Sequence, residues 1–347
     1  MTAVPDLTPA LLAEGLPGWL AATLGCGAVE LVGAKRLSGG AIQQNWLLDL
    51  GMMGGDQRTR RVVLRTDAAN SVGAGLSRVE EYAVLQTAWT GGVRVAEPLG
   101  VEPSGDVIGR PFFLCGALGG TAVGSRIVRD PDAFGGRDRL AEALARELAV
   151  IHTITPGPAA VAVLEEPAEN PAQRAIARYR DDLDAMSSAR PVVELALRAL
   201  ELDLQARGEV CFCHRDFRTG NFMADEAGLT GILDWEFAGW SDPHEDLGWF
   251  CSHPWRFGAD ACEAGGLVPR DRFLMLYRAQ GGRAVDPSRV AWWELMASVR
   301  WAVIALQQAD RVRVAGERSL DLALIGYRIP DIEKEILRLL AERGWRS

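Results

Sequence analysis

The chain lacks several features that would place it in a large class of proteins at once. Its six cysteines include no Cys-x-x-Cys pair, which argues against a four-ligand zinc site and favours a reduced, cytoplasmic protein. No apolar run approaches the roughly 20 residues of a membrane helix. The first residues have neither the basic nor the apolar region of a signal peptide, and we find no internal repeat or low-complexity tract.

Positive charge is also scarce. The 37 lysines and arginines are outnumbered by 46 acidic residues, and the resulting net charge of -9 argues against non-specific nucleic-acid binding. It does not exclude a nucleotide, for which a few local cations suffice. The composition is otherwise that of a globular protein, with 48% hydrophobic and 24% charged residues, and 347 residues allow two domains or one two-lobed unit. The oligomeric state is not indicated.

The first third of the chain predicts a β-rich region. Apolar residues at helical spacing over 7–24 are interrupted by Pro17 and Gly18, which favours two short turns over one helix. A helix is expected over 77–89, and a hairpin loop over 51–56. Apolar runs bounded by turn residues predict five strands, over 31–37, 45–50, 61–65, 93–101 and 107–115.

Beyond residue 116 the composition shifts to helix formers. Asp242 and Pro243 together predict a helix start. The other expected helices cover 137–151, two stretches within 171–206, 291–308 and 330–342, and short strands are expected at 210–213, 221–223 and 229–233. The whole pattern predicts an α+β protein with a small antiparallel-sheet lobe over 1–115 and a mainly helical lobe over 116–347.

Three polar residues in the second part are spaced for phosphoryl-transfer chemistry. Asn221 follows Asp216 by five positions, and Asp234 comes thirteen later. A loop carboxylate can take the proton of a hydroxyl nucleophile, while amide and carboxylate oxygens suit Mg²⁺. Phosphoryl transfer needs groups of this kind to orient the nucleophile and neutralise charge. Each residue alone is equally consistent with a turn or a helix cap.

These residues also resemble a known family. His214–Asp216 with Asn221 resembles the catalytic loop of the protein-kinase-like superfamily, and Leu233–Glu236 resembles the metal-binding motif of its aminoglycoside phosphotransferase and choline kinase branch. Over about 30–310 the chain is most similar to the group of that branch that also occurs fused to acyl-CoA dehydrogenases. Further motifs that carry the resemblance lie at 37–40, 63–65, 81–85, 108–112 and 229–250.

The resemblance implies a two-lobed kinase that uses ATP and Mg²⁺ to phosphorylate a hydroxyl group of a small molecule. It implies Asp216 as the catalytic base, and Asn221 and Asp234 as the Mg²⁺ ligands. The implied nucleotide-binding residues are Ser38, Gly39, Gly40 and Ala41 over the phosphates, Arg65 with its partner Glu81, Gly116 to Leu118 at the adenine, and Met223 beneath the base. No Ala-Pro-Glu motif follows Asp234, which favours a small acceptor over a protein.

Other interpretations of the same residues remain open. Arg65, where the superfamily has Lys, and the sparse glycines at 39–40 would also suit a non-catalytic nucleotide-binding regulator. A metal-dependent hydrolase using Asp216 and Asp234 would leave the β-rich region unexplained. The acceptor is not indicated among antibiotic, choline-like, sugar and hydroxyacyl-CoA classes, nor is the choice of ATP or GTP. Arg218, within the loop, could contact an anionic acceptor or only solvent, and it is the only feature that argues against a polycationic, aminoglycoside-like acceptor.

Several residues that invite a functional interpretation favour a structural one. Cys211 and Cys213 share one face of a short strand, which predicts core packing, and His152 continues the apolar stripe of 137–151. His214 and Asp246 are expected to brace the catalytic loop. Trp240 and Trp255 are also considered as lining for an acceptor pocket.

Overall fold

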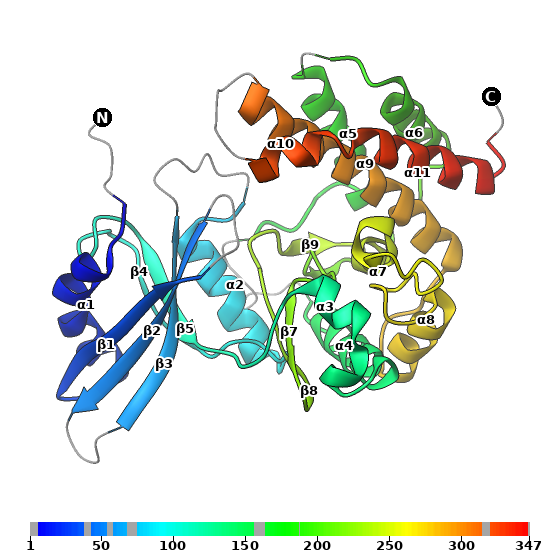
Figure 1. Ribbon diagram of the computed structural model, residues 1–347. Coiled ribbons are helices and arrows are strands. Elements are labelled where there is room, and N and C mark those ends of the chain that lie inside the picture. Colours follow the sequence, from blue (N-terminus) through cyan, green and yellow to red (C-terminus); the bar gives the residue numbers. More distant parts are fainter. Residues whose placement is uncertain are drawn as a thin grey trace.

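The protein combines an antiparallel sheet with a larger, mainly helical part. Figure 1 shows the two parts side by side, in a computed structural model of the chain. This arrangement confirms the predicted α+β architecture. The described residues are 6–37, 43–53, 58–67, 75–155, 164–186, 188–313 and 320–345.

The sheet has the strand order β1-β2-β3-β5-β4, and all its neighbouring strands are antiparallel. The elements of this part are α1 (Pro9–Leu24), β1 (Ala28–Arg36), β2 (Gln43–Met53), β3 (Arg58–Asp67), α2 (Arg78–Thr90), β4 (Pro98–Glu102) and β5 (Phe112–Gly116). Two expectations need correction here. Strand β2 continues through the start of the predicted loop at 51, and the stretches 93–97 and 107–111 lie outside β4 and β5.

Helix α1 corrects the expectation of two short turns over 7–24. It runs unbroken through Pro17 and Gly18. A proline inside a helix costs about 3 kcal/mol or more, but Leu12, Leu16 and Leu20 are each fully buried against the sheet. At about 1.5–3 kcal/mol for each buried leucine, the burial outweighs the lost hydrogen bond.

The two faces of the sheet are covered by different helices. Figure 1 shows α1 and α2 on opposite sides of it. Alternation along β3 sends Val62 and Leu64 into the core beneath α1 and Val63 towards the core that includes α2. Arg65 follows Val63 by two and therefore projects towards α2.

The second part contains most of the helices and two short antiparallel sheets, β6 with β9 and β7 with β8. Its elements are α3 (Gly124–Arg129), α4 (Arg137–Ile151), α5 (Pro171–Asp184), α6 (Pro191–Leu202), β6 (Cys211–Cys213), β7 (Phe222–Asp225), β8 (Gly228–Ile232), β9 (Gly239–Ser241), α7 (Pro243–Cys251), α8 (Arg270–Ala279), α9 (Pro287–Arg313), α10 (Leu320–Gly326) and α11 (Ile329–Glu342), with 3-10 turns at Pro131–Phe134 and His253–Arg256.

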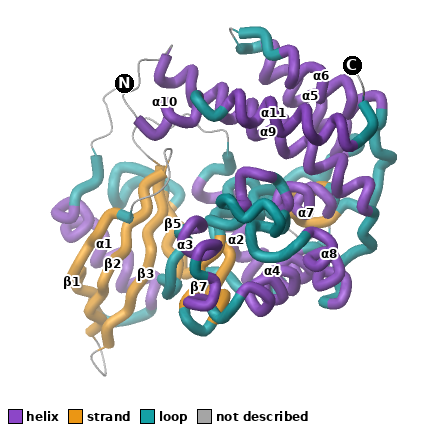
Figure 2. The backbone as a smooth tube through the Cα atoms, turned by 45° about the vertical axis from the view of Figure 1, so that its right-hand side comes forward, coloured by secondary structure: helices purple, strands orange, loops and turns teal. Residues whose placement is uncertain are grey.

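Helices α5, α6, α9 and α11 gather at one end of the molecule and share a core, which Figure 2 shows from a second direction. Helix α7 packs across α9 nearer the sheet part. Its start confirms the predicted cap, because Asp242 accepts a hydrogen bond from the His244 N–H at 2.9 Å. Within the described residues, no helix has the length and apolar character needed to span a membrane.

The β7–β8 hairpin ties the two parts together. Thr121, just after β5, exchanges backbone hydrogen bonds of 2.8 and 3.0 Å with Ala224 in β7, and the Ile232 N–H donates to the Arg94 carbonyl at 2.8 Å. One apolar core also runs continuously from α2 to α4 and α8. The division of the chain at residue 116 therefore stays a prediction, since the packing is continuous there.

Candidate active site

The loop after β6 is held in place by the first turn of α7. Asp246, fully buried, accepts the backbone N–H of His214 at 2.8 Å and that of Arg215 at 2.6 Å. Arg215 has a positive φ of 60°, a conformation that costs a non-glycine residue about 1–3 kcal/mol. Hydrogen bonds to a charged carboxylate are strong enough to offset this. The predicted bracing role of Asp246 is confirmed.

Two buried histidines complete the support of this loop. His214 Nδ1 accepts the Asp216 N–H at 3.2 Å, so Nε2 carries the proton donated to the Leu233 carbonyl at 2.8 Å. Burial lowers the pKa of His214, in keeping with a neutral ring. His152 Nε2 lies 3.1 Å from Asp246 and its Nδ1 lies 2.7 Å from the Tyr277 hydroxyl. His214 therefore braces the loop, and His152 is a satisfied core histidine, both as predicted.

Donors on both sides fix the Asp216 carboxylate. Trp249 Nε1 donates to Oδ1 at 2.8 Å, and Asn221 Nδ2 donates to Oδ2 at 2.5 Å. Arg218 Nε lies 3.3 Å from Oδ1, with its guanidinium 4.4 Å from the centre of the Trp255 ring. Asp216 is almost wholly buried, with 6% of the residue exposed, so the orientation of its carboxylate is set by the protein and not by water.

Arg65 brings the sheet part into contact with the second acid. One terminal nitrogen of Arg65 lies 2.5 Å from Asp234 Oδ1, and its Nε lies 2.9 Å from Glu81 Oε1 on α2. Burial acting alone would raise the pKa of Asp234, but the Arg65 guanidinium outweighs it and the pKa is lowered. Asp234, at a positive φ of 67°, is therefore held as a carboxylate at the junction of the two parts.

Glu81 and Glu236 add negative charge around Arg65. Glu81 also pairs with Arg78, one turn earlier on α2. Glu236 accepts a hydrogen bond from Gln43 at the start of β2, and its carbonyl accepts the Leu76 N–H at 3.0 Å. Burial, with a smaller contribution from Asp234, raises the pKa of Glu236 to about 7. Glu236 thus joins the helical part to the sheet part a second time.

The donor atoms near Asp234 fit a divalent cation. The side-chain amide nitrogen of Asn221 donates to Asp216, and the backbone carbonyl of Asn221 accepts the Leu233 N–H at 2.8 Å, which fixes the residue beside Asp234. Among the described residues, neither Asn221 Oδ1 nor Asp234 Oδ2 accepts a hydrogen bond. Two free hard oxygens, one of them anionic, form a donor set suited to Mg²⁺.

The other predicted residues fall into two groups. Ser38, Gly39, Gly40 and Ala41 lie outside the described residues. Gly116 ends β5, and the Leu118 N–H donates no hydrogen bond within the described residues. Leu118 packs over Gly231, where any added Cβ would lie 2.5 Å from its side chain. Met223 pairs with Gly231 across the β7–β8 hairpin, so Leu118 and Met223 belong to one neighbourhood.

Sequence reasoning missed two contacts around Asp216. Trp249 lies one helical turn after Asp246 on α7, and that spacing places both on the face towards the loop. It is the signal that could have identified Trp249. Arg300 on α9 lies over the Trp249 ring at 4.3 Å and donates to the Arg215 carbonyl. No local pattern marks Arg300, because its contact depends on how α7 and α9 pack.

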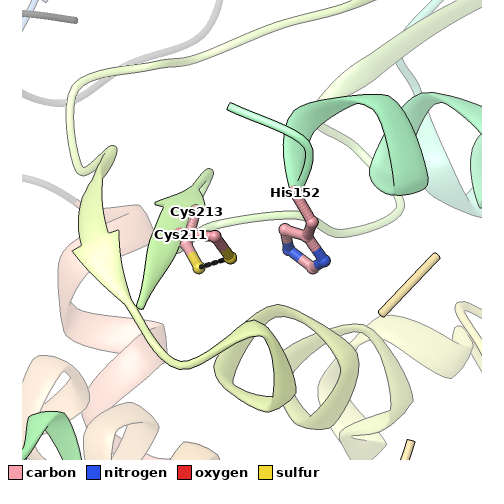
Figure 3. A group of neighbouring side chains, drawn as sticks. All are labelled: His152, Cys211 and Cys213. Carbon is pink, nitrogen blue, oxygen red and sulfur yellow. Dashed lines mark hydrogen bonds between the residues drawn. The ribbon is translucent and has the colours of Figure 1, made fainter. Parts of the chain in front are cut away.

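Three buried side chains form a second cluster with metal-ligating atoms. Figure 3 shows Cys211, Cys213 and His152 close together, with the two sulfur atoms 3.8 Å apart. Both nitrogens of His152 are already engaged, by Asp246 and Tyr277. Burial raises the pKa of Cys213 well above its usual value, which disfavours the thiolate that a metal needs. The predicted core packing is confirmed. Trp240, which packs edge-to-face against Phe212 and donates its indole N–H to the Leu164 carbonyl, is also core.

Comparison with known proteins agrees with this geometry. A family model described as the phosphotransferase enzyme family matches residues 33–293, whereas no curated protein matches the sequence. A candidate aminoglycoside phosphotransferase from Ralstonia eutropha has a TM-score of 0.74 at 19% identity, covering 95% of this chain and 98% of that one. A choline/ethanolamine kinase family protein from Mesorhizobium loti has a TM-score of 0.59 at 18% identity, covering 95% and 93%.

A third solved structure is a thermostable mutant of the aminoglycoside phosphotransferase APH(4)-Ia, in a ternary complex with AMP-PNP and hygromycin B. It has a TM-score of 0.57 at 16% identity, covering 93% of this chain and 98% of that one. At these identities the structures show a shared fold. The family match is the stronger finding, because it runs from β1 into α9 and includes Asp216, Asn221 and Asp234. The chain therefore belongs to the phosphotransferase enzyme family.

Proposed function

We propose that the protein is an ATP- and Mg²⁺-dependent kinase that transfers a phosphoryl group to a hydroxyl of a small molecule. The observation that carries the proposal is the single connected set of groups from both parts of the fold. Arg65 and Glu81 from the sheet part meet Asp234, and Asp234 is joined through the Leu233–Asn221 backbone bond to the Asp216 loop. Phosphoryl transfer depends on such positioning and charge stabilisation.

Asp216 is the group that would accept the proton of the attacking hydroxyl. Its carboxylate is aimed by Trp249 and Asn221, so little reorganisation is needed when an acceptor binds. A base in this position is worth about 10²–10⁴ in rate. Arg218 lies 3.3 Å from Oδ1 of the same carboxylate. A fixed cation there can stabilise negative charge that develops during transfer.

Asn221 Oδ1 and Asp234 Oδ2 would hold Mg²⁺. When bound, the ion neutralises charge on the nucleotide phosphates and orients them for in-line attack. Arg65 then keeps Asp234 ionised and also offers a guanidinium fork near the phosphates. The Leu118 N–H supplies a backbone donor for the nucleotide base, and Met223 an apolar surface beneath it. The AMP-PNP complex of APH(4)-Ia supports a nucleotide of this class.

The acceptor is a small molecule. Nine positions separate Asp234 from the first residue of α7 at Pro243, which is too short for the peptide-binding segment of a protein kinase. The relatives named for aminoglycosides and for choline or ethanolamine have small-molecule acceptors in their names. A panel of hydroxyl compounds, assayed for ADP release, is the way to identify the acceptor class.

The substitution Asp216→Asn tests the proposal. Because the amide cannot take up the proton, we expect kcat to fall about 10²–10⁴-fold, with nucleotide affinity in a binding titration changed by less than about threefold. Asp225→Asn is the matched control, since it makes the same change in the exposed turn of the neighbouring hairpin. Wild-type turnover by Asp216→Asn would refute the assigned base.

A second candidate is a nucleotide-binding regulator without catalysis. The observation in its favour is the Arg65–Asp234 ion pair at 2.5 Å, which occupies one oxygen of the carboxylate proposed for the metal. Titration of ATP with and without Mg²⁺, followed by the acceptor panel, separates the two functions. Metal-dependent binding with ADP release identifies a kinase, whereas binding without any release supports the regulator.

A further inference from the structure

A cavity lined by arginines lies between helix α5 and the catalytic loop. It has a volume of about 260 Å³, and Arg174 and Arg178 on α5 line it together with Arg215. Among the described residues, Glu245 is the only carboxylate in its wall. Figures 1 and 2 both place α5 in the helical end of the molecule, away from the sheet. Neither the proposed nucleotide site nor the Mg²⁺ ligands use these residues.

The one carboxylate in the described part of the wall forms its direct ion pair with a single arginine. Glu245 Oε1 lies 3.1 Å from Arg215 Nε, and its second oxygen accepts the Ser241 hydroxyl. Arg174 donates to the Trp240 carbonyl at 3.0 Å, which is a neutral partner. Arg178 approaches a carboxylate only at 3.9 Å, that of Asp182 outside the wall. The cavity therefore has an excess of positive charge.

The spacing of the two α5 arginines also brings their like charges close together. Residues four apart on a helix are neighbours, and two like charges there are mildly destabilising. Arg174 and Arg178 also line the same cavity as Arg215, a third cation. Burial, with a contribution from the Arg215 guanidinium, lowers the pKa of Arg174. An anion in the cavity would remove this repulsion.

We propose that the cavity lined by Arg174, Arg178 and Arg215 is a binding site for a phosphate or carboxylate group. Guanidinium groups bind such oxyanions through two parallel N–H donors. At about 30 Å³ for each water, the volume holds about nine waters, enough for an oxyanion and part of the molecule that carries it. Because Arg215 directly precedes Asp216, an anion bound there lies beside the catalytic loop.

Inorganic phosphate tests the site without requiring turnover. At constant ionic strength, balanced with sodium chloride, we expect phosphate to bind the wild-type protein and Arg178→Gln to weaken that binding about tenfold. This is the size expected for losing one charge-assisted hydrogen bond. Arg174→Gln should weaken binding similarly. Arg178 is half exposed, so its substitution leaves the core intact.

Arg272→Gln on α8 is the matched control. Arg272 is similarly exposed and lies 3.7 Å from Asp138, and Figures 1 and 2 show its helix α8 apart from α5. It should bind phosphate as the wild type does. Phosphate binding that is absent in the wild type, or equally strong in Arg178→Gln, overturns the proposal, because phosphate held only in the nucleotide site would be insensitive to Arg178.

Turnover assays then identify the source of the anion. If it is a group of the acceptor itself, Arg178→Gln should lower kcat/KM about tenfold for a phosphorylated or carboxylated acceptor and leave a neutral analogue within about twofold. If it is a free anion, added phosphate should change the rate with a neutral acceptor in the wild type and not in Arg178→Gln. The phosphate titration needs neither result, so it succeeds or fails independently of the proposed kinase activity.

Discussion

Among single residues, Arg65 makes the contact on which the assembly of the site depends. The fork of its guanidinium reaches Glu81 through Nε and Asp234 through a terminal nitrogen at the same time. A lysine ammonium is one point charge and cannot occupy both positions. The arginine that departs from the superfamily pattern therefore has its own geometric role, which is to hold the buried Glu81 and the partly exposed Asp234 from different parts of the fold.

Substitution of Arg65 should destabilise the protein in two steps. Arg65→Lys leaves either Glu81 or Asp234 without its partner, at a cost of about 1–3 kcal/mol. Arg65→Met removes both ion pairs, at about 3–5 kcal/mol. The measurement is urea unfolding. Arg61→Lys on the same strand is the control, because its ion pair with Asp49 is exposed and should change stability by less than about 0.5 kcal/mol. An Arg65→Lys protein as stable as wild type would show that one ion pair suffices.

The site residues differ in how far sequence could identify them. Asp216, Asn221 and Asp234 form a pattern of fixed spacing on adjoining loops and strands, so their proximity follows from local structure. Trp249 and Arg300 contact this loop only because α7 packs against α9, and that packing is not encoded in any local motif. The cationic cavity was equally hidden, since Arg174 lies 41 positions before Arg215 and meets it through tertiary contacts.

Among the secondary-structure elements, α7 and α9 cross at very close range. Gly248 allows it, because an added Cβ would lie 2.7 Å from the Trp293 backbone and Cβ. Helix α7 also carries Asp246 and Trp249, which hold the Asp216 loop. Moving this helix by a fraction of an ångström therefore moves the donors to the loop and to Asp216.

Gly248→Ala should destabilise the protein and reduce turnover together. Overpacking of this kind typically costs about 1–3 kcal/mol, and a displaced α7 would misorient Asp216. Gly18→Ala in α1 is the control, since nothing lies within 4 Å of its added Cβ, and it should stabilise by about 0.5–1 kcal/mol without changing turnover. For each variant, thermal unfolding measures the change in stability and ADP release measures the change in turnover. An unchanged melting temperature for Gly248→Ala would show that α7 can shift without penalty.

The secondary-structure predictions were correct where the sequence pattern was strong and uninterrupted. The amphipathic helix over 137–151 has the bounds of α4, and the cap at Asp242 starts α7. The prediction for α1 was wrong because local rules weigh Pro17 and Gly18 heavily and cannot count the three leucines that the sheet buries. Burial against the sheet makes α1 a single helix, and the strands of that sheet lie outside the local stretch of sequence from which the helix was predicted.

In the molecule as a whole, the two parts share one apolar core and meet again through side chains at the site. Arg65 with Asp234, and Gln43 with Glu236, connect the sheet to the helical part. A nucleotide bound between Leu118, Arg65 and Asp234 would add contacts to both parts at once. Its binding should therefore stabilise the complete protein, and the metal-dependent part of that stabilisation should require Asp234 as a metal ligand.

Thermal unfolding with and without the metal tests this coupling. At a concentration about 100 times its Kd, MgATP should add ~2.7 kcal/mol and raise the melting temperature by roughly 5 °C. ATP with EDTA should give a smaller rise, because Asn221 and Asp234 then face uncompensated phosphate charge. In Asp234→Asn, read as the shift from its own ligand-free value, the difference between MgATP and ATP with EDTA should vanish, while Asp225→Asn keeps it. If Asp234→Asn retains the full magnesium-dependent shift, the metal is bound elsewhere and the connection through Asp234 is wrong.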